Sequence, residues 1–304
     1  MSKPKLIVVL GPTACGKSSL GVTLAKQYGG EIVSADSRQV YRGLDLGTGK
    51  IPPEEMEGVP HHLLDVADPG EAYSVARFQQ EAYAALDGIL SRGHLPFLVG
   101  GTGLYLRAVA EGYVFHDAPP DTALRARLED MSAPELRDEL AALGVEADAD
   151  AWNNRPRLVR LIEKTRNGED PHAEAPRQPR YEVLTLGVSY PRAVICDRID
   201  RRLQVRLDAG MIQEVAGLRA RGVPDAFLEG LGLEYRYILW YLQGKLSSEE
   251  ELTDELGRAI KRFAKRQVSW FKKDRDVHWL GMEGDPVGEA RELIDAFLAG
   301  DERS

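Results

Sequence analysis

The stretch GPTACGKS, from Gly11 to Ser18, constrains the fold of this chain more than any other part of the sequence. It fits the phosphate-binding loop pattern G-x-x-x-x-G-K-[ST] at every position. A run of Leu, Ile and Val at 5–10 precedes it, as in a buried parallel strand, and a helical pattern at 17–28 follows. In such an arrangement, backbone N–H groups and the helix N-terminus bind phosphate. The sequence therefore predicts an α/β fold with a polyphosphate site made of Gly11, Pro12, Thr13, Ala14, Cys15, Gly16, Lys17 and Ser18.

Two side chains of this loop have a chemistry of their own. Lys17 supplies a positive point charge, and the hydroxyl of Ser18 is a suitable ligand for Mg²⁺. We therefore expect a magnesium cofactor with Ser18 as its protein ligand. Cys15 is interpreted as a small loop residue. A similar segment at 47–50 is interpreted as a turn, because no strand precedes it and no Ser or Thr follows it.

The rest of the chain alternates between sheet-like and purely helical regions. Strand patterns lie at 31–34, 95–99, 181–188 and 277–280, and a helical pattern lies at 74–91. Strand signals are absent from 119 to 179, and helical patterns return from 195 to 275. These shifts predict a P-loop parallel-sheet core with a helical insertion domain and a helical C-terminal region. The expected ranges are 1–117 and 181–304 for the core and 118–180 for the insertion.

The strand at 95–99 lacks a residue that many P-loop nucleoside triphosphatases have. Their strand ends in an Asp that helps to hold the metal, whereas this one ends in Gly100 and Gly101. Another acid, Asp36, follows the strand at 31–34. If that strand is adjacent to the first, Asp36 faces the crevice above the P-loop. The competing interpretation of Asp36 is a turn or N-cap carboxylate.

Composition excludes several classes of protein. The chain has 304 residues with 43% hydrophobic and 29% charged residues, which is ordinary for a soluble enzyme and excludes disordered and fibrous chains. Its longest apolar run is far shorter than the ~20 residues of a membrane span. Two cysteines build neither a disulfide framework nor a zinc site. With no signal peptide pattern at the N-terminus, we expect a cytoplasmic protein without membrane contact.

Basic residues cluster locally although the net charge is −9. The window 256–276 holds eight basic and two acidic residues, and Arg262 and Lys265 recur there at helical spacing. Smaller clusters lie at 155–166 and 198–206. One explanation is a polyanionic partner such as RNA, and the other is a solvated basic face.

Five segments together resemble the tRNA dimethylallyltransferase family, also called the tRNA isopentenyltransferase family. They occur in the family's order and read GPTACGKS, SADSRQVYRGLDLGTGK, HHLLDVADPGEAYSVARF, LVGGTGLYLRA and AKRQVSWF. The resemblance implies transfer of a dimethylallyl group from dimethylallyl diphosphate to the exocyclic amine of adenine 37, just 3′ of the anticodon. The acceptors implied are tRNAs that read codons beginning with U, and the products are isopentenyladenosine and diphosphate.

The resemblance also implies roles for individual residues. Asp36 is the candidate base, and Thr102 and Lys17 act with it in catalysis. The P-loop then binds the diphosphate, and the anticodon stem-loop of tRNA contacts the helical insertion. We expect a monomer. The residues expected to contact tRNA are Asp36, Ser37, Arg38, Gln39, Thr102, Arg125, Arg157, Arg160, Arg262 and Lys265. Thr102 could equally serve as an ordinary helix N-cap after two glycines.

Three alternatives remain from the sequence. A small-molecule P-loop kinase explains the loop and Asp36 but not the basic helix or the missing acid at 100. An adenylate isopentenyltransferase would need neither a helical insertion nor a basic helix. A non-catalytic RNA-binding protein with a relic P-loop is disfavoured by the intact Lys17, Ser18 and Asp36. The sequence does not decide whether the loop also binds ATP.

Overall fold

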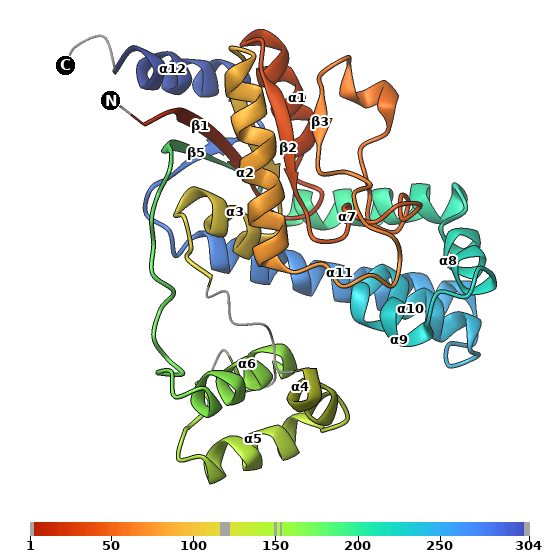
Figure 1. Cartoon of the computed structure of the whole chain (residues 1–304). Helices are drawn as coiled ribbons and strands as arrows, with labels where there is room; N and C mark the ends of the chain where they lie inside the picture. The colour runs from red at the N-terminus through yellow and green to blue at the C-terminus, as the bar shows by residue number, and fades with distance from the viewer. Residues whose placement is uncertain (1–2, 116–121, 149–150, 153, 301–304) are drawn as a thin grey trace. The chain divides into compact units, whose positions relative to one another are not determined.

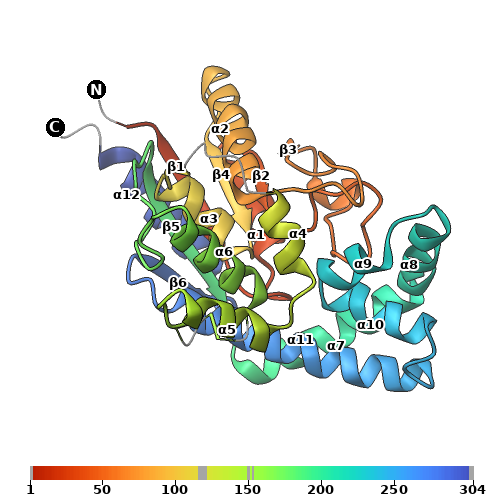
Figure 2. The same cartoon turned by 60° about the horizontal axis from the view of Figure 1, so that its bottom comes forward.

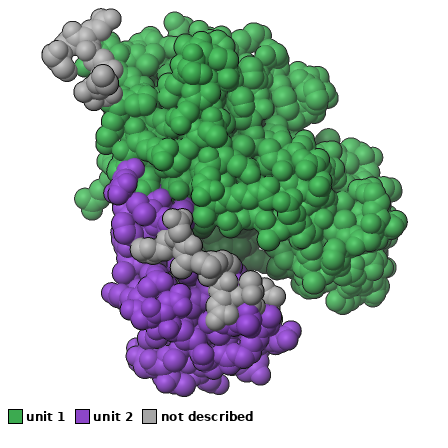
Figure 3. Space-filling model, in the orientation of Figure 1, with its two compact units in different colours: residues 1–112, 179–304 green, residues 113–178 purple. Residues whose placement is uncertain are grey.

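The computed structural model describes residues 3–115, 122–148, 151–152 and 154–300 (Figure 1). The chain forms two compact units, one of residues 1–112 and 179–304 and the other of residues 113–178 (Figure 3). The sequence places the boundaries at 117/118, which lies outside the described residues, and at 180/181. The P-loop sheet and the C-terminal helices belong to the first unit, and the insertion forms the second.

The first unit is built on a six-stranded parallel sheet in the order β3-β2-β4-β1-β5-β6. Central strands are runs of aliphatic residues because both faces of a parallel sheet are covered. The predicted strands are all present, with ends shifted by one residue at most. The bounds are β1 Lys5–Leu10, β2 Glu31–Ala35, β3 His61–His62, β4 Pro96–Gly100, β5 Glu182–Ser189 and β6 Val277–Gly281.

Alternate residues of β1 pack into the two hydrophobic layers on either side of the sheet. Leu6 and Val8 face a core shared with α2 (Val75–Ser91) and α3 (Gly103–Ala110). Ile7 and Val9 face a core shared with α1 (Lys17–Gln27) and α12 (Pro286–Ala299). Both layers are visible in Figure 1. The fold is therefore the α/β architecture that the sequence predicts.

The order of the strands corrects one expectation. The sequence suggests β2 as the neighbour of β1, but β4 lies between them and pairs with both. The connection through α1 therefore leaves room for one strand, and the later strand β4 fills it. The two-residue strand β3 is also missed, because a segment this short has no periodicity to detect.

A helical region with its own core extends the first unit. Its helices enclose buried side chains such as Ile199, Tyr235 and Leu256, and the loop residues Val40 and Leu44 pack against them. Helix α11 lies beside α7 and α10 (Figures 1 and 2). The bounds are α7 Arg192–Asp208, α8 Met211–Ala220, α9 Asp225–Leu231, α10 Leu233–Leu242 and α11 Glu249–Phe271, and a short 3₁₀ turn lies at Pro53–Met56.

The described residues of the second unit form three helices, α4 Thr122–Glu129, α5 Ala133–Ala142 and α6 Arg155–Arg166. Leu128, Leu136, Leu140 and Leu158 are fully buried among them and form a separate core. Helix α5 begins with a capping box in which the Ser132 side chain and Glu135 satisfy each other's backbone N–H groups. No helix in the described part of the chain is long and apolar enough to cross a membrane.

Candidate active site

The P-loop joins the end of β1 to the start of α1 with two residues in the left-handed region. Gly16 has φ 85° and Ala14 has φ 61°. Gly16 is also the N-cap of α1 and provides no side-chain cap, so the first N–H groups of the helix are open to a ligand. The backbone is thus shaped as an anion site, as the sequence predicts for residues 11–18.

Lys17 and Ser18 stand at the open end of this loop. Lys17 is half-buried and its Nζ lies 3.4 Å from the carbonyl oxygen of Pro12, which is a weak contact. Ser18 is exposed. Among the described residues, no group of three or more His, Cys, Asp or Glu side chains could hold a metal by itself. The expected Mg²⁺ site at Ser18 stays a prediction; this ion is usually held by few protein ligands together with substrate phosphates.

Cys15 is a packing residue of the loop. Its side chain is fully buried against the sheet, and burial raises the pKa of the thiol despite the opposing charge of Lys17. A protonated, inaccessible thiol is a poor nucleophile. The interpretation as a small loop residue fits this environment.

The glycines at the end of β4 bring three strands close together. A Cβ atom at Gly100 would lie 2.2 Å from the carbonyl oxygen of Ala35, and one at Gly101 would lie 3.5 Å from Cε of Lys17. An Asp at position 100 would therefore clash with β2. A Cβ at Gly101 would also lie 3.2 Å from Nε2 of Gln267, so these glycines allow the ends of β1, β2 and β4 to approach closely.

Asp36 and Thr102 follow the ends of the neighbouring strands β2 and β4. Oδ1 of Asp36 accepts a hydrogen bond from the backbone N of Arg38 at 3.0 Å, so the expected turn role is present. This hydrogen bond fixes the carboxylate and leaves Oδ2 with no protein donor among the described residues. Thr102 occupies the N-cap position of α3 without capping it, since its Oγ1 accepts from the backbone N of Ser37 at 3.1 Å. Thr102 therefore holds the segment that carries Asp36.

Arg38 and Gln39, expected at the RNA, already have partners within the protein. Arg38 donates to Glu234 at 3.3 Å, and its guanidinium lies over the ring of Phe263. Gln39 bonds Ser34 through Oε1 and the carbonyl of Gly49 through Nε2. A contact between either residue and RNA would have to share or replace these bonds.

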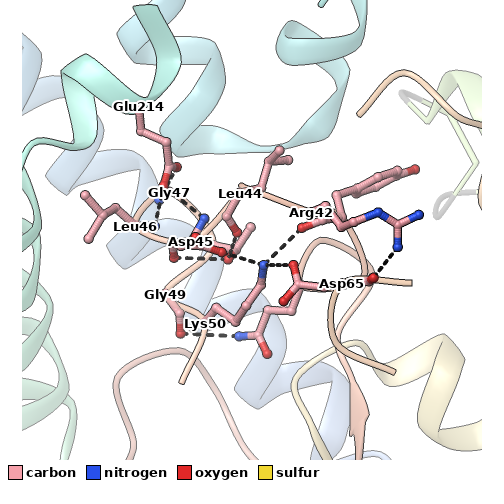
Figure 4. Close-up of polar contacts among 12 residues, drawn as sticks. Arg42, Leu44, Asp45, Leu46, Gly47, Gly49, Lys50, Asp65 and Glu214 are labelled. Atoms are coloured by element: carbon pink, nitrogen blue, oxygen red, sulfur yellow. Dashed lines mark hydrogen bonds and ion pairs between the residues drawn. The ribbon is translucent and has the colours of Figure 1, made fainter. Parts of the chain in front are cut away.

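Two charged side chains, Glu214 and Lys50, order the loop after Gln39 (Figure 4). The carboxylate of Glu214 accepts from the backbone N–H groups of Asp45, Leu46 and Gly47 at 2.7–2.9 Å. Lys50, whose side chain is 6% exposed, pairs with both Asp45 and Asp65 at 2.6 Å. The segment at 47–50 is a turn, as expected, and Lys50 holds the loop together rather than binding phosphate.

Three arginines of α7 line the P-loop and this neighbouring loop. Arg198 donates to the carbonyl of Ala14 at 2.8 Å, Arg202 to that of Gly49 at 3.1 Å, and Arg206 to that of Leu46. The sequence leaves RNA or solvent as the partner of this cluster, whereas in the structure Arg198 bonds the P-loop and Arg202 and Arg206 bond the loop at 46–49. Their spacing of four residues, which puts them on one helix face, is the signal that could have found this role.

Helix α11 presents the basic face that the sequence predicts. Arg258 and Lys261 pair with Glu255 and Asp200. Arg262, Lys265 and Lys272 are exposed, and no carboxylate of the described residues pairs with them. The unpaired positive charge of the helix is therefore concentrated toward its C-terminal half.

In the second unit, two of the three expected RNA-binding arginines hold a buried acid. Glu163 has a side chain that is 5% exposed, and both Arg125 and Arg160 pair with it. Arg157 is exposed in the first turn of α6. Arg125 and Arg160 thus stabilise the insertion whatever else they contact.

His62 takes part in a hydrogen-bonded cluster around Glu31. His62 and His94 both lie 2.6 Å from the carboxylate of the buried Glu31, which Arg92 also binds at 2.8 and 2.9 Å. The Arg92 guanidinium, helped by both histidines, lowers the pKa of Glu31 to about 2. This cluster stabilises the end of the sheet opposite to the P-loop.

The fold and this site define an α/β enzyme that has a P-loop but lacks the acid on β4 typical of nucleotide hydrolysis. The family model described as "IPP transferase" matches residues 39–274, and that described as "Isopentenyl transferase" matches residues 4–68. The chain belongs to the tRNA dimethylallyltransferase family, and it is an enzyme of that type.

Individual relatives and solved structures agree with this assignment. A tRNA dimethylallyltransferase of an Exiguobacterium species is 41% identical over 93% of this chain and 92% of its own length. One from Desulforudis audaxviator is 42% identical over 97% and 98%. The crystal structure of a tRNA isopentenylpyrophosphate transferase from Bacillus halodurans has a TM-score of 0.73 at 37% identity, over 97% of this chain and 96% of that one. A eukaryotic dimethylallyltransferase acting on tRNA has a TM-score of 0.79 at 26% identity, over 97% and 80%.

Proposed function

We propose that this chain transfers the dimethylallyl group of dimethylallyl diphosphate to the exocyclic amine of adenine 37 in tRNAs that read codons beginning with U. The observation that carries the proposal is the bare glycine end of β4, which separates an anion-binding loop from the carboxylate of Asp36. An electrophile with a diphosphate tail and an amine nucleophile need this arrangement of sites. The fold positions both because β1, β4 and β2 end at one edge of the sheet.

The chemistry follows from these positions. The adenine amine attacks the allylic carbon, the bond from that carbon to the diphosphate oxygen breaks, and the amine proton passes to Asp36. Lys17 and the open N–H groups of α1 stabilise charge on the departing diphosphate, and the α7 arginine Arg198 adds positive charge beside the loop. Bound Mg²⁺ at Ser18 would neutralise part of that diphosphate charge. Because the carbon is allylic, help for the leaving group counts for more than the strength of the nucleophile.

The acceptor must be held by surfaces outside this crevice. The exposed residues Arg262, Lys265 and Lys272 on α11 suit phosphates of the anticodon arm, and Arg157 of the insertion is exposed in the first turn of α6. The adenine must leave its stack to react, which the segment from Asp36 to Gln39 would support. We also propose that the chain works as a cytoplasmic monomer, a state that analytical ultracentrifugation checks.

Radiolabelled dimethylallyl diphosphate tests the proposal directly. With Mg²⁺ present, label should enter total tRNA, a nuclease digest should yield isopentenyladenosine, and AMP should stay unlabelled. Lys17→Ala and Ser18→Ala should abolish most transfer while tRNA binding survives, and Lys26→Ala is the control because Lys26 pairs with Glu57 on the surface. Labelling of AMP would favour an adenylate isopentenyltransferase. Phosphate transfer from ATP to a small molecule, with tRNA unlabelled, would favour a kinase.

A further inference from the structure

Gln267 connects the P-loop to the end of β4. This half-buried residue lies on α11, and its Oε1 accepts a hydrogen bond from the backbone N of Thr13 at 3.0 Å. Its Nε2 donates to the carbonyl oxygen of Gly101 at 3.1 Å. One side chain therefore joins two backbone segments that belong to different strand ends.

The partners of Gln267 leave its amide only one orientation. A backbone N–H is solely a donor and a carbonyl oxygen is solely an acceptor, so the amide oxygen must face Thr13 and the amide nitrogen must face Gly101. Glutamine alone among the ordinary side chains of this length satisfies both. Glutamate could keep the first bond but not the second, and leucine could keep neither.

Beyond Gly101, the contact continues to the segment that carries Asp36. Thr102 follows Gly101, its backbone N donates to the carbonyl of Ala35 at 3.3 Å, and its Oγ1 accepts from the backbone N of Ser37 at 3.1 Å. The hydrogen bonds thus run from Thr13 through Gln267 and Thr102 to Ser37. They join the loop that binds the diphosphate to the segment that holds the base.

We propose that Gln267 is a positioning residue that sets the distance between the bound diphosphate and Asp36. The inference rests on the function proposed above. Reacting atoms must come within about 3–3.5 Å with aligned orbitals, and a displacement of about 1 Å costs roughly 10²-fold in rate. Gln267 touches backbone only, so it acts on the reaction through the segments it holds and not through the substrates.

The test uses Gln267→Leu, which removes both bonds at similar volume, and Gln267→Glu, which removes the bond to Gly101. For each variant, the Kd for tRNA and for dimethylallyl diphosphate is measured along with the single-turnover rate at saturation of both. We expect the rate of Gln267→Leu to fall by roughly 10–10²-fold with both Kd values within about threefold of wild type. Gln267→Glu should also be slow. Gln204→Leu is the matched control, because Gln204 is exposed on α7 and bonds only Asp208 there.

Other outcomes would overturn the inference. A wild-type rate in either Gln267 variant shows that the link to Gly101 does not set the geometry. A raised Kd for tRNA with a normal saturated rate shows that Gln267 contacts RNA, as its basic neighbours on α11 do. A fall in active fraction and Tm, with a normal rate per folded molecule, shows a purely structural residue. If wild-type protein itself fails to modify tRNA, the proposed function fails before this inference is reached.

Discussion

At the scale of single residues, the site depends on side chains that bond backbone. Asp36 is fixed by its turn bond to the N of Arg38, and Thr102 uses its hydroxyl on Ser37 instead of capping α3. For Asp36 the structure shows the turn bond and leaves the catalytic interpretation open, whereas for Thr102 it shows a bond to Ser37 in place of the expected N-cap bond. The turn bond holds Oδ1 of Asp36, and Oδ2 has no protein donor among the described residues.

Asp36→Asn is expected to slow the chemical step by ~10²–10⁴-fold, the usual worth of general-base help. The amide keeps the size of the side chain and its turn bond, so binding of tRNA and of dimethylallyl diphosphate should survive. Single-turnover rates at saturating tRNA measure the effect. The control is Asp295→Asn, because Asp295 lies on α12 and accepts a hydrogen bond from Tyr28. If the Asn variant reacts within a fewfold of wild type, the proton goes elsewhere, and the departing diphosphate is then the better acceptor. Rescue by excess Mg²⁺ would instead assign Asp36 to the metal.

At the scale of elements, α11 serves three purposes on three faces. Leu256, Ile260 and Ala264 pack into the helical core, Gln267 reaches the P-loop, and the exposed basic residues face solvent. A long helix with one apolar face can do this because its other positions are free to vary. The helix therefore connects the proposed RNA surface to the P-loop.

The affinity for tRNA should fall steeply with salt although the chain is acidic overall. Replacing Arg262, Lys265 and Lys272 together by Ala should flatten the slope of log affinity against log salt by about two to three units, because each phosphate contact contributes about 0.7–0.9. Binding titrations between 50 and about 200 mM salt measure the slope. The control is Arg258→Ala with Lys261→Ala, whose charges are already paired with Glu255 and Asp200. An unchanged slope in the triple variant would leave α11 as a merely solvated face.

Glu31 on β2 pairs through its carboxylate with His62, His94 and Arg92, which follows the end of α2. The pKa of Glu31 is lowered from 4.5 to about 2 in the folded chain. Its stabilisation is therefore fully present above pH ~4.5 and is lost as the pH falls toward 2. Glu31→Gln should lower the free energy of unfolding at pH 7 by about 3 kcal/mol.

Urea unfolding at several pH values checks this prediction. The difference between wild type and Glu31→Gln should shrink as the pH is lowered from 5 toward 2. Glu57→Gln is the matched control, since Glu57 pairs with Lys26 on the surface and such pairs contribute about 0–1 kcal/mol. A constant difference across this pH range would mean that Glu31 stabilises the fold by packing and not by its charge.

At the scale of the whole molecule, the chain forms two units with separate cores. The first holds the P-loop, Asp36 and α11, and the second encloses its own leucines. A small unit buries a smaller fraction of its surface and is less stable. A substitution that weakens the core of the second unit should therefore reduce the affinity for tRNA before it affects the chemical step.

Leu158→Ala should weaken tRNA binding while binding of dimethylallyl diphosphate stays at the wild-type level. Leu158 is fully buried in the second unit, and such a truncation costs about 2–5 kcal/mol. Filter binding of tRNA and calorimetry with the diphosphate measure the two affinities, with Val205→Ala, which is 65% exposed on α7, as control. A parallel loss of both affinities would show that the two units do not act independently.

Features that depend on neighbouring residues could be predicted from the sequence. The strand, loop and helix from Lys5 to Gln27 follow from a short aliphatic run, two glycines and a helical period, all local interactions. The same holds for the remaining long strands and for the basic face of α11. Family motifs along the chain then identified the chemistry, because motif spacing is a property of the sequence alone.

Which segments contact one another follows from the packing of the whole chain. This packing placed β4 between β1 and β2, turned Arg198 toward the P-loop, paired Arg125 with Glu163, and brought Gln267 to Thr13 from 254 residues away. Periodicity tells which face of a helix is polar, but it does not tell which neighbour that face finds. That choice depends on packing the whole core at once, and no window of sequence contains it.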